Sequence, residues 1–263
     1  MTTVAATIDT ATKAGRGVLV GYLPAGFPSV PDSVDALVAL ARAGADILEL
    51  GIPYSDPVMD GLVIQEATSG SLAAGFRVRD VFSIIRDVRA QVDVPILVMT
   101  YWNPVVQYGV DRFAVDLKEA GGVGVITPDL IPDEAGEWID ASTKHGLERV
   151  FLAAPSSTDE RLRSAVENST GFVYAVSTMG ITGARDDVDS AARSLVQRLR
   201  GVGATSVCVG LGISTADQVR DVCSYADGAI VGSHLVSALA RGGAGAVSEA
   251  TESLVHGTSR ENA

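Results

Sequence analysis

Eight short apolar runs recur along the chain, and their spacing is the feature that most restricts its fold. Each run is rich in Val, Ile and Leu, too short for a helix and typical of a buried strand. The runs are Val18–Tyr22, Ile47–Gly51, Pro95–Thr100, Val123–Thr127, Arg149–Ala154, Phe172–Ser177, Ser206–Gly212 and Gly228–Ser233. Their apolar residues are nearly continuous, which indicates parallel strands covered by helices.

Segments with helical periodicity separate these runs. Ser33–Gly44 places its apolar side chains on one stripe and ends at a glycine, a natural helix C-cap. The similar segments are Arg79–Val92, Asp111–Gly122, Asp159–Gly171, Asp189–Gly203 and Thr215–Gly228. Strands that alternate with helices over 263 residues predict an α/β fold, the (β/α)8 TIM barrel. A doubly wound open sheet is the alternative.

The chain shows no linker rich in Pro or Ser, so we expect one domain over residues 1–263. Before the first strand, residues 1–17 carry four apolar side chains at roughly helical spacing. They are Val4, Ile8, Ala11 and Ala14. This spacing predicts an extra N-terminal helix that closes the bottom of the barrel.

Charge and composition exclude several classes of partner. The chain has 20 Lys and Arg against 32 Asp and Glu, a net charge of −12, which disfavours nucleic acid and an anionic membrane surface. We find no long uncharged apolar run and no signal peptide at the N-terminus. Cys208 and Cys223 are expected to be reduced core residues. These features predict a soluble, cytoplasmic protein.

Active sites of this fold lie at the carboxyl ends of the strands, and few ionisable residues are expected there. The three lysines fall in helical segments, which disfavours Schiff-base chemistry. The three histidines show no metal-ligand spacing, so no metal site is expected. These residues are Lys13, Lys118, Lys144, His145, His234 and His256.

Carboxylates remain as candidates. Glu49 lies within an apolar strand, on the same face as Ile47 and Gly51, and burial should raise its pKa into the range of a proton-transferring group. The alternative is a structural Glu paired with a buried Arg. Asp56 and Asp60 follow in the next loop, where turn formation competes with a functional role.

Glycines follow three consecutive strands, in Ser177–Arg185, Gly210–Ser214 and Val231–Leu235, and a helix-like segment begins at Ser233. Backbone N–H groups and a helix N-terminus bind phosphate in this fold without a cation, although each glycine could simply serve a tight turn. Asp129, after the fourth strand, is typical of a loop or helix-capping residue. These residues predict acid/base chemistry on a small phosphorylated substrate, by a lyase or an isomerase.

The segment LELGIPYSDPVMDG (Leu48–Gly61) resembles the signature of the tryptophan synthase alpha chain family. Further motifs occur in the family's order across about residues 18–235. They are GYLPAGFP, MTYWNPV, TPDLIP, PSST, STMGITGAR, GLGIS and VGS. The resemblance implies retro-aldol cleavage of indole-3-glycerol phosphate to indole and glyceraldehyde 3-phosphate.

The resemblance also implies roles for individual residues. Glu49 protonates indole C3 and assists removal of the glycerol hydroxyl proton, while Asp60 hydrogen-bonds the indole N–H. The matching phosphate-binding residues are Gly183, Gly212, Gly232 and Ser233, and those lining the indole end are Tyr22, Thr100 and Tyr174. A mobile loop over residues 177–190 closes on substrate and brings Thr182 to Asp60. Some members of the family carry Phe in place of Tyr22 and Arg in place of Thr178.

The resemblance implies a partner, the pyridoxal phosphate-dependent beta chain of an α2β2 heterotetramer, which receives the indole. The alpha chain itself then needs no cofactor. Residues matching the interface are Pro53, Asp56, Asn103 and Pro104.

Two other functions remain as alternatives. One is a related phosphate-binding barrel, a sugar isomerase or indole-glycerol-phosphate synthase. The synthase needs lysines that this chain lacks at strand ends, and the isomerases use a carboxylate where this chain has Gly21 and Tyr22. The other is a non-catalytic subunit that only activates the beta chain. It should lack Glu49 or Asp60, and both are present.

Overall fold

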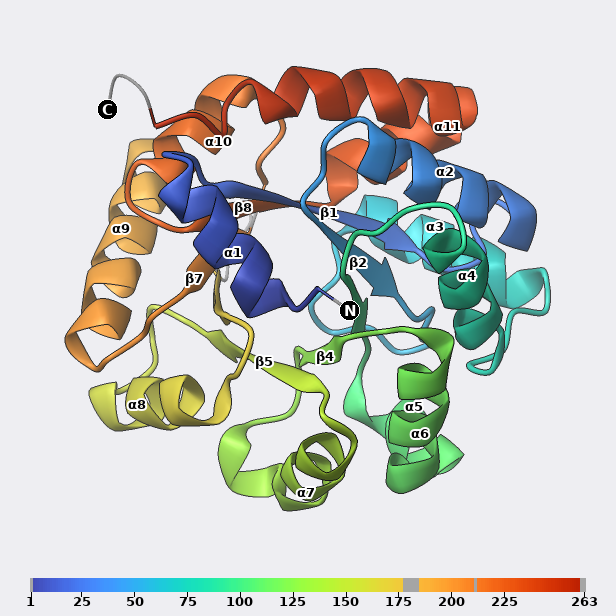
Figure 1. Ribbon diagram of the computed structural model, residues 1–263, viewed down its shortest axis with the longest axis horizontal. Helices are drawn as coiled ribbons and strands as arrows, with labels where there is room; N and C mark the ends of the chain where they lie inside the picture. Colours follow the sequence, from blue (N-terminus) through green and yellow to red (C-terminus); the bar gives the residue numbers. More distant parts are fainter. Residues whose placement is uncertain (1, 177–184, 211, 261–263) are drawn as a thin grey trace.

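The computed structural model describes residues 2–176, 185–210 and 212–260. Eight parallel strands pair in sequence order and close into a barrel, because β8 pairs with β1 (Figure 1). The strands are β1 (Val18–Pro24), β2 (Ile47–Gly51), β3 (Ile96–Met99), β4 (Gly124–Thr127), β5 (Glu148–Ala153), β6 (Val173–Val176), β7 (Val207–Gly210) and β8 (Gly228–Val231). The predicted TIM barrel is confirmed, and the open sheet is excluded.

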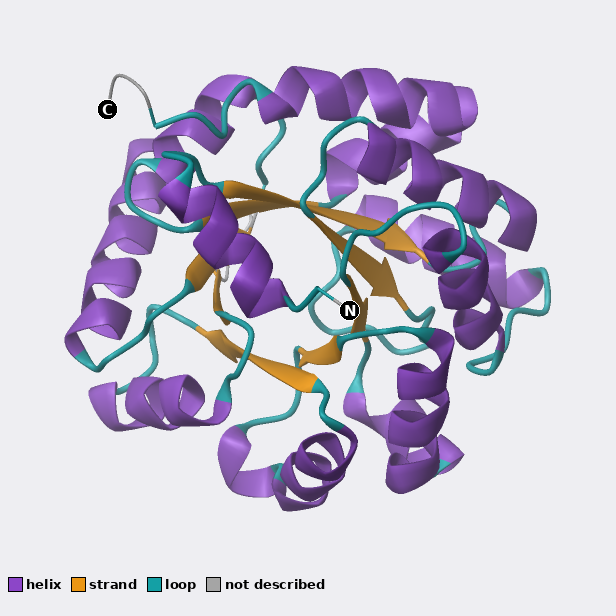
Figure 2. Cartoon of the chain, viewed as in Figure 1, coloured by secondary structure: helices purple, strands orange, loops and turns teal. Residues whose placement is uncertain are grey.

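Helices surround the barrel (Figure 2). They are α1 (Val4–Lys13), α2 (Val30–Arg42), α3 (Leu62–Ala73), α4 (Asp80–Arg89), α5 (Trp102–Tyr108), α6 (Val110–Ala120), α7 (Gly136–His145), α8 (Asp159–Asn168), α9 (Arg185–Gly201), α10 (Ala216–Cys223) and α11 (Ser233–Val255), with a 3-10 helix at Pro132–Glu134. The last helix bends at Gly242 and Gly243, where the backbone leaves helical geometry. No helix within the described ranges combines the length and apolarity needed to cross a membrane.

Strand alternation divides the apolar residues into two cores. In β2, Ile47 belongs to the cluster inside the barrel, whereas Leu48 and Leu50 pack outward against the helices. Glu49 therefore points inward with Ile47, as the two-residue period of a strand requires. The barrel interior is filled with side chains and is not a pore.

Predicted and observed strands differ at either end by at most two residues, as where the predicted Gly228–Ser233 ends at Val231. The sequence analysis gave no residue range for α3, α5 or α7. The residues that α3 buries are Ala67, Thr68 and Ser71, which are too small and polar to form an apolar stripe. Part of the predicted loop 177–190 is helical, since α9 begins at Arg185, while residues 177–184 lie outside the described chain.

Helix α1 lies across the bottom of the barrel (Figure 1). Val4, Ile8 and Ala11 join the interior cluster, as the spacing predicted. The prediction was wrong for Ala14, which is exposed because the helix has already ended at Lys13. The half-buried carboxylate of Glu148, at the start of β5, accepts hydrogen bonds from the N–H groups of Val4 at 2.9 Å and Ala5 at 3.2 Å. These bonds fix the helix N-terminus to the barrel.

Two other carboxylates stabilise the same end of the barrel. Asp46, just before β2, accepts two hydrogen bonds from Arg16 at 2.7 and 2.9 Å and a third from the Leu19 N–H at 2.9 Å. Asp227, just before β8, is 8% exposed and is paired with Arg200. Acidic residues at the amino ends of these strands therefore have structural partners.

We expect Glu148→Ala to lower the free energy of unfolding by about 1–2 kcal/mol, because two N–H groups at the start of α1 lose their acceptor. Urea unfolding followed by circular dichroism measures this loss. Glu148→Gln, which keeps an acceptor oxygen, should cost less. Asp9→Ala is the control on the same helix, since Asp9 and its partner Lys13 are 60% and 75% exposed. Equal losses for Glu148→Ala and Asp9→Ala would contradict the assignment.

Candidate active site

Glu49 lies on β2 beside Tyr22 on β1, the two being register partners in neighbouring strands. The carboxyl group is 1% exposed, and its Oε2 atom has no hydrogen-bond partner among the described residues. Burial, followed by repulsion from Asp60, raises the pKa of Glu49 to about 8. No Arg of the described chain forms an ion pair with it, so the structural alternative is not supported there.

Asp60 lies in the loop between β2 and α3 and is half-buried. Burial raises its pKa to about 6, while a hydrogen bond with Tyr101 acts in the opposite direction. The two carboxyl groups therefore titrate in different ranges. Near pH 7, Glu49 is mostly protonated and Asp60 mostly ionised, the combination that allows one group to donate a proton and the other to stabilise positive charge.

Two tyrosines flank this pair, and each packs against a glycine. A Cβ atom on Gly51 would lie 2.3 Å from the Tyr22 hydroxyl, and one on Gly210 would lie 2.1 Å from the Tyr174 hydroxyl. Both rings are buried close to the carboxylates, which contribute to the raised pKa of each tyrosine after burial itself. The close approach of Tyr174 therefore explains why position 210 is a glycine.

The N-terminus of α11 lies beside the same loop. Its N-cap, Gly232, is followed by Ser233, and no side chain caps this end of the helix. A Cβ atom on Gly61 would lie 4.0 Å from the Ser233 hydroxyl oxygen, so this helix end is adjacent to Asp60. Gly212, after β7, is exposed, with φ of 64°. The backbone N–H groups of such a helix end suit a phosphate group.

The other predicted substrate-binding residues divide into two cases. Thr182 and Gly183 lie outside the described residues. Thr100 is 1% exposed, and its hydroxyl donates to the carbonyl of Tyr101 at 2.9 Å. The Thr100 hydroxyl therefore fixes the backbone at Tyr101.

Sequence reasoning missed Tyr101, which follows β3. Its ring is 4% exposed, and its hydroxyl accepts a hydrogen bond from the Met59 N–H at 3.0 Å, next to Asp60. The resemblance pointed to Tyr22 and Tyr174 at strand ends but not to Tyr101, although the motif MTYWNPV contains it. Asp129 caps α5 by accepting a hydrogen bond from the Trp102 N–H at 2.9 Å, in accord with its predicted capping role.

Of the predicted interface residues, Pro53 in the loop after β2 is buried and Pro104 on α5 is half-buried, while the other two are exposed. Asp56 is exposed and accepts a hydrogen bond from Ser55 at 2.6 Å. Asn103, on α5, is also exposed and donates to the Tyr54 hydroxyl at 3.4 Å. The loop after β2 and helix α5 therefore meet at this surface.

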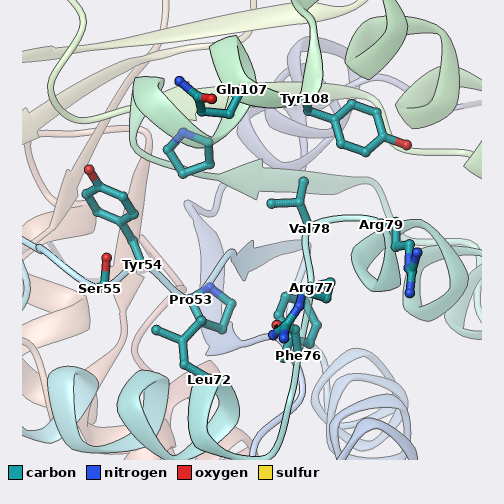
Figure 3. Close-up of a pocket in the computed structure, with 11 residues that line it drawn as sticks. Pro53, Tyr54, Ser55, Leu72, Phe76, Arg77, Val78, Arg79, Gln107 and Tyr108 are labelled. Atoms are coloured by element: carbon teal, nitrogen blue, oxygen red, sulfur yellow. Dashed lines mark hydrogen bonds between the residues drawn. The ribbon is translucent and has the colours of Figure 1, made fainter.

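A pocket of about 500 Å³ opens behind this loop, between α3 and α5 (Figure 3). It is lined by Pro53, Tyr54, Ser55, Leu72, Phe76, Arg77, Val78, Arg79, Pro104, Gln107 and Tyr108. Neither Glu49 nor Asp60 lines it, so this pocket is separate from the carboxylate pair. Pro53 and Pro104 face it and belong to the predicted interface.

Exposed large apolar side chains gather on the same part of the molecule. Among the described residues they lie on segments that follow β2, β3 and β4. They are Val58, Leu62, Val63, Val106 and Ile131, of which Val58 and Leu62 are each 77% exposed. Apolar side chains concentrated on one surface indicate a contact with another protein. Over the described ranges, no group of three or more His, Cys, Asp and Glu side chains is arranged to hold a metal ion.

Comparison with known proteins gives one consistent result. The profile of the tryptophan synthase alpha chain family matches residues 8–262. The alpha chain of Leifsonia xyli is 63% identical over 260 residues, covering 99% of this chain and 100% of that protein.

Solved structures show the same similarity. A Mycobacterium tuberculosis tryptophan synthase structure has a TM-score of 0.92 and 50% identity, covering 97% of each chain. A tryptophan synthase complex from Pyrococcus furiosus has a TM-score of 0.81 and 34% identity, covering 92% of this chain and 98% of that one. With its barrel, its carboxylate pair and a family match over nearly its whole length, the chain belongs to the tryptophan synthase alpha chain family.

Proposed function

We propose that this chain cleaves indole-3-glycerol phosphate to indole and glyceraldehyde 3-phosphate, as the carbon–carbon lyase of the alpha reaction in tryptophan biosynthesis. The observation that carries the proposal is the buried Glu49, with a pKa of about 8, beside Asp60, with a pKa of about 6, in a chain of this family. The decisive experiment measures indole released by the purified chain, alone and with a matching beta chain.

Glu49 acts as the proton-transferring group. Its protonated carboxyl donates a proton to indole C3, and the carbon–carbon bond then breaks with its electron pair returning to the ring. The glycerol hydroxyl becomes the aldehyde and gives its proton back to the Glu49 carboxylate. No electron is gained or lost overall. A carboxyl group that is still protonated near neutral pH is required for the first step, and burial supplies it.

Asp60 stabilises the ring that Glu49 protonates. Protonation at C3 places positive charge on the indole nitrogen, and an ionised carboxylate that accepts the N–H hydrogen bond lowers the energy of that state. Tyr22 and Tyr174 bound the indole end of the site. Thr100 contributes to the site indirectly, because its hydroxyl fixes the backbone at Tyr101.

The phosphate group binds at the N-terminus of α11. The N–H groups after Gly232 and Ser233 supply donors, together with the loop at Gly212, and the helix dipole favours the anion. Thr182 and Gly183 complete the site from the loop at 177–190, of which 177–184 lies outside the described chain. An anion site built from backbone suits a chain of net charge −12.

The beta chain is the partner, and pyridoxal phosphate belongs to that chain, since the alpha chain family needs no cofactor. The docking surface comprises Pro53, Asp56, Asn103 and Pro104. The exposed apolar side chains Val58 and Val106 lie on the same segments, Ile131 follows the next strand, β4, and all three add apolar area. Indole then passes from this site to the beta chain of the heterotetramer.

We also propose a cytoplasmic location for this single barrel domain. Cys208 and Cys223 are free and buried, which agrees with a reducing compartment.

Glu49→Gln removes the transferable proton but keeps the size of the side chain. We expect indole release to fall by about 10²-fold or more, with substrate binding and thermal unfolding nearly unchanged. Single-turnover kinetics and calorimetric binding measure the two effects separately. Turnover near the wild-type rate would show that Glu49 is not the acid.

The two carboxyl groups predict a bell-shaped dependence of kcat/KM on pH. Activity should fall below about pH 6, because Asp60 becomes protonated, and above about pH 8, because Glu49 loses the proton that it must donate. Steady-state assays from pH 5 to 9.5, at constant ionic strength, test both limbs. In Asp60→Asn the acidic limb assigned to Asp60 should vanish from the residual activity. Its persistence would assign that limb to another group.

Asp56→Ala should weaken coupling to the beta chain more than intrinsic binding of a phosphate-bearing substrate, because Asp56 is exposed on the outer side of the loop. Association with the beta chain is measured by titration calorimetry, and phosphate binding by protection from thermal unfolding. Asp93→Ala, which removes another exposed carboxylate with an ion pair to Arg89, is the control for charge. If Asp56→Ala weakened both kinds of binding equally, Asp56 would belong to the substrate site.

A further inference from the structure

Tyr101 supports the turn that carries Asp60. Its hydroxyl oxygen accepts the Met59 N–H at 3.0 Å, one residue before Asp60. On the other side of the turn, the Gln65 side-chain amide donates to the Asp60 carbonyl at 2.7 Å. The backbone of the turn is therefore held on both sides, and Tyr101 lowers the pKa of the Asp60 carboxyl group against the effect of burial.

Tyr101 is itself held firmly. The Thr100 hydroxyl donates to its carbonyl at 2.9 Å, and the next N–H, that of Trp102, donates to Asp129 at 2.9 Å. Its ring packs against the ring of Tyr54, with centroids 5.1 Å apart, and is 4% exposed. A side chain fixed in this way can impose its geometry on the loop that it touches.

We infer that Tyr101 is a positioning residue for Asp60: by accepting the Met59 N–H, its hydroxyl holds the turn in the geometry that aims the Asp60 carboxylate at the substrate. The inference rests on the proposed function for the role of Asp60 in cleavage. The contact between Tyr101 and the turn is independent of it.

The groups that face Asp60 explain why the neighbouring Tyr101 hydroxyl matters. Glu49 on β2, Tyr22 on β1, Tyr174 on β6 and Tyr101 after β3 all interact with it electrostatically. Among the described residues, none of these groups is a cation. Burial raises the pKa of Asp60, and Tyr101 lowers it. Tyr101 therefore favours the ionised form of this carboxylate, as an Arg or Lys does beside many buried carboxylates.

Tyr101→Phe is the central test, because it removes the hydroxyl and keeps the ring. Carbon-13 NMR of the Asp60 carboxyl, in the chain without substrate, should show its pKa rising above about 6. The acidic limb of kcat/KM should move to higher pH by about one unit, a roughly tenfold loss of activity on that side. A residue with a merely structural role would lower activity without moving either pKa or limb.

Site-specific replacement of Tyr101 by 3-fluorotyrosine gives the opposite change. Fluorine makes the phenol a stronger donor while leaving its ring and hydroxyl in place, so the pKa of Asp60 should fall. This variant also decides the question if Tyr101→Phe does not fold. Opposite shifts in the two variants are expected only if the Tyr101 hydroxyl itself acts on the Asp60 carboxylate.

Tyr108→Phe is the matched control. Tyr108 is the last residue of α5 and lies in the same region of the chain as Tyr101. Its hydroxyl donates to Asp116 at 2.5 Å, away from the turn. Its loss should leave the pKa of Asp60 unchanged. An Asp60 pKa that moves in neither Tyr101 variant would overturn the inference. Wild-type protein that released no indole would instead overturn the proposed function, because the NMR titration requires no turnover.

Discussion

The pairing of β8 with β1 is the constraint on which the rest of the structure depends. Closure gives every strand two neighbours and places all eight carboxyl ends around one opening. It also gives each strand one inward and one outward face. Glu49 points inward because Ile47 does, and it is only 1% exposed there. The raised pKa of the carboxyl group is thus a consequence of closure and strand period together.

Carboxylates serve different purposes at the two ends of the barrel. At the amino ends of the strands, Asp46, Glu148 and Asp227 accept hydrogen bonds from arginines or backbone N–H groups, which keeps their charges compensated. At the carboxyl ends, Glu49 and Asp60 interact electrostatically with tyrosines and with each other. Compensated charges stabilise a fold, whereas uncompensated ones acquire the shifted pKa values that proton transfer needs.

Much of the fold and part of the site could be predicted from the sequence. Strands formed by continuous apolar runs were found, since their signal is local, and the face of Glu49 followed from the two-residue period. Helix α3 was missed because it buries small and polar residues. The glycines at strand ends were interpreted together as a phosphate site, and the sequence did not show that Tyr174, far away along the chain, requires the glycine at position 210. Tyr101 was missed because its hydroxyl meets Met59 across 42 residues.

The sequence by itself determined the order of strands and helices, the inward direction of Glu49 and, through its motifs, the family. These depend on periodicity and on residue types at fixed spacing, which the chain carries locally. Only the tertiary structure decided which groups surround each carboxylate. That set the pKa of Glu49 and of Asp60 and brought Tyr101 to the turn before α3. The physical reason is that desolvation and hydrogen bonding depend on neighbours in space, and barrel closure brings those neighbours from different strands.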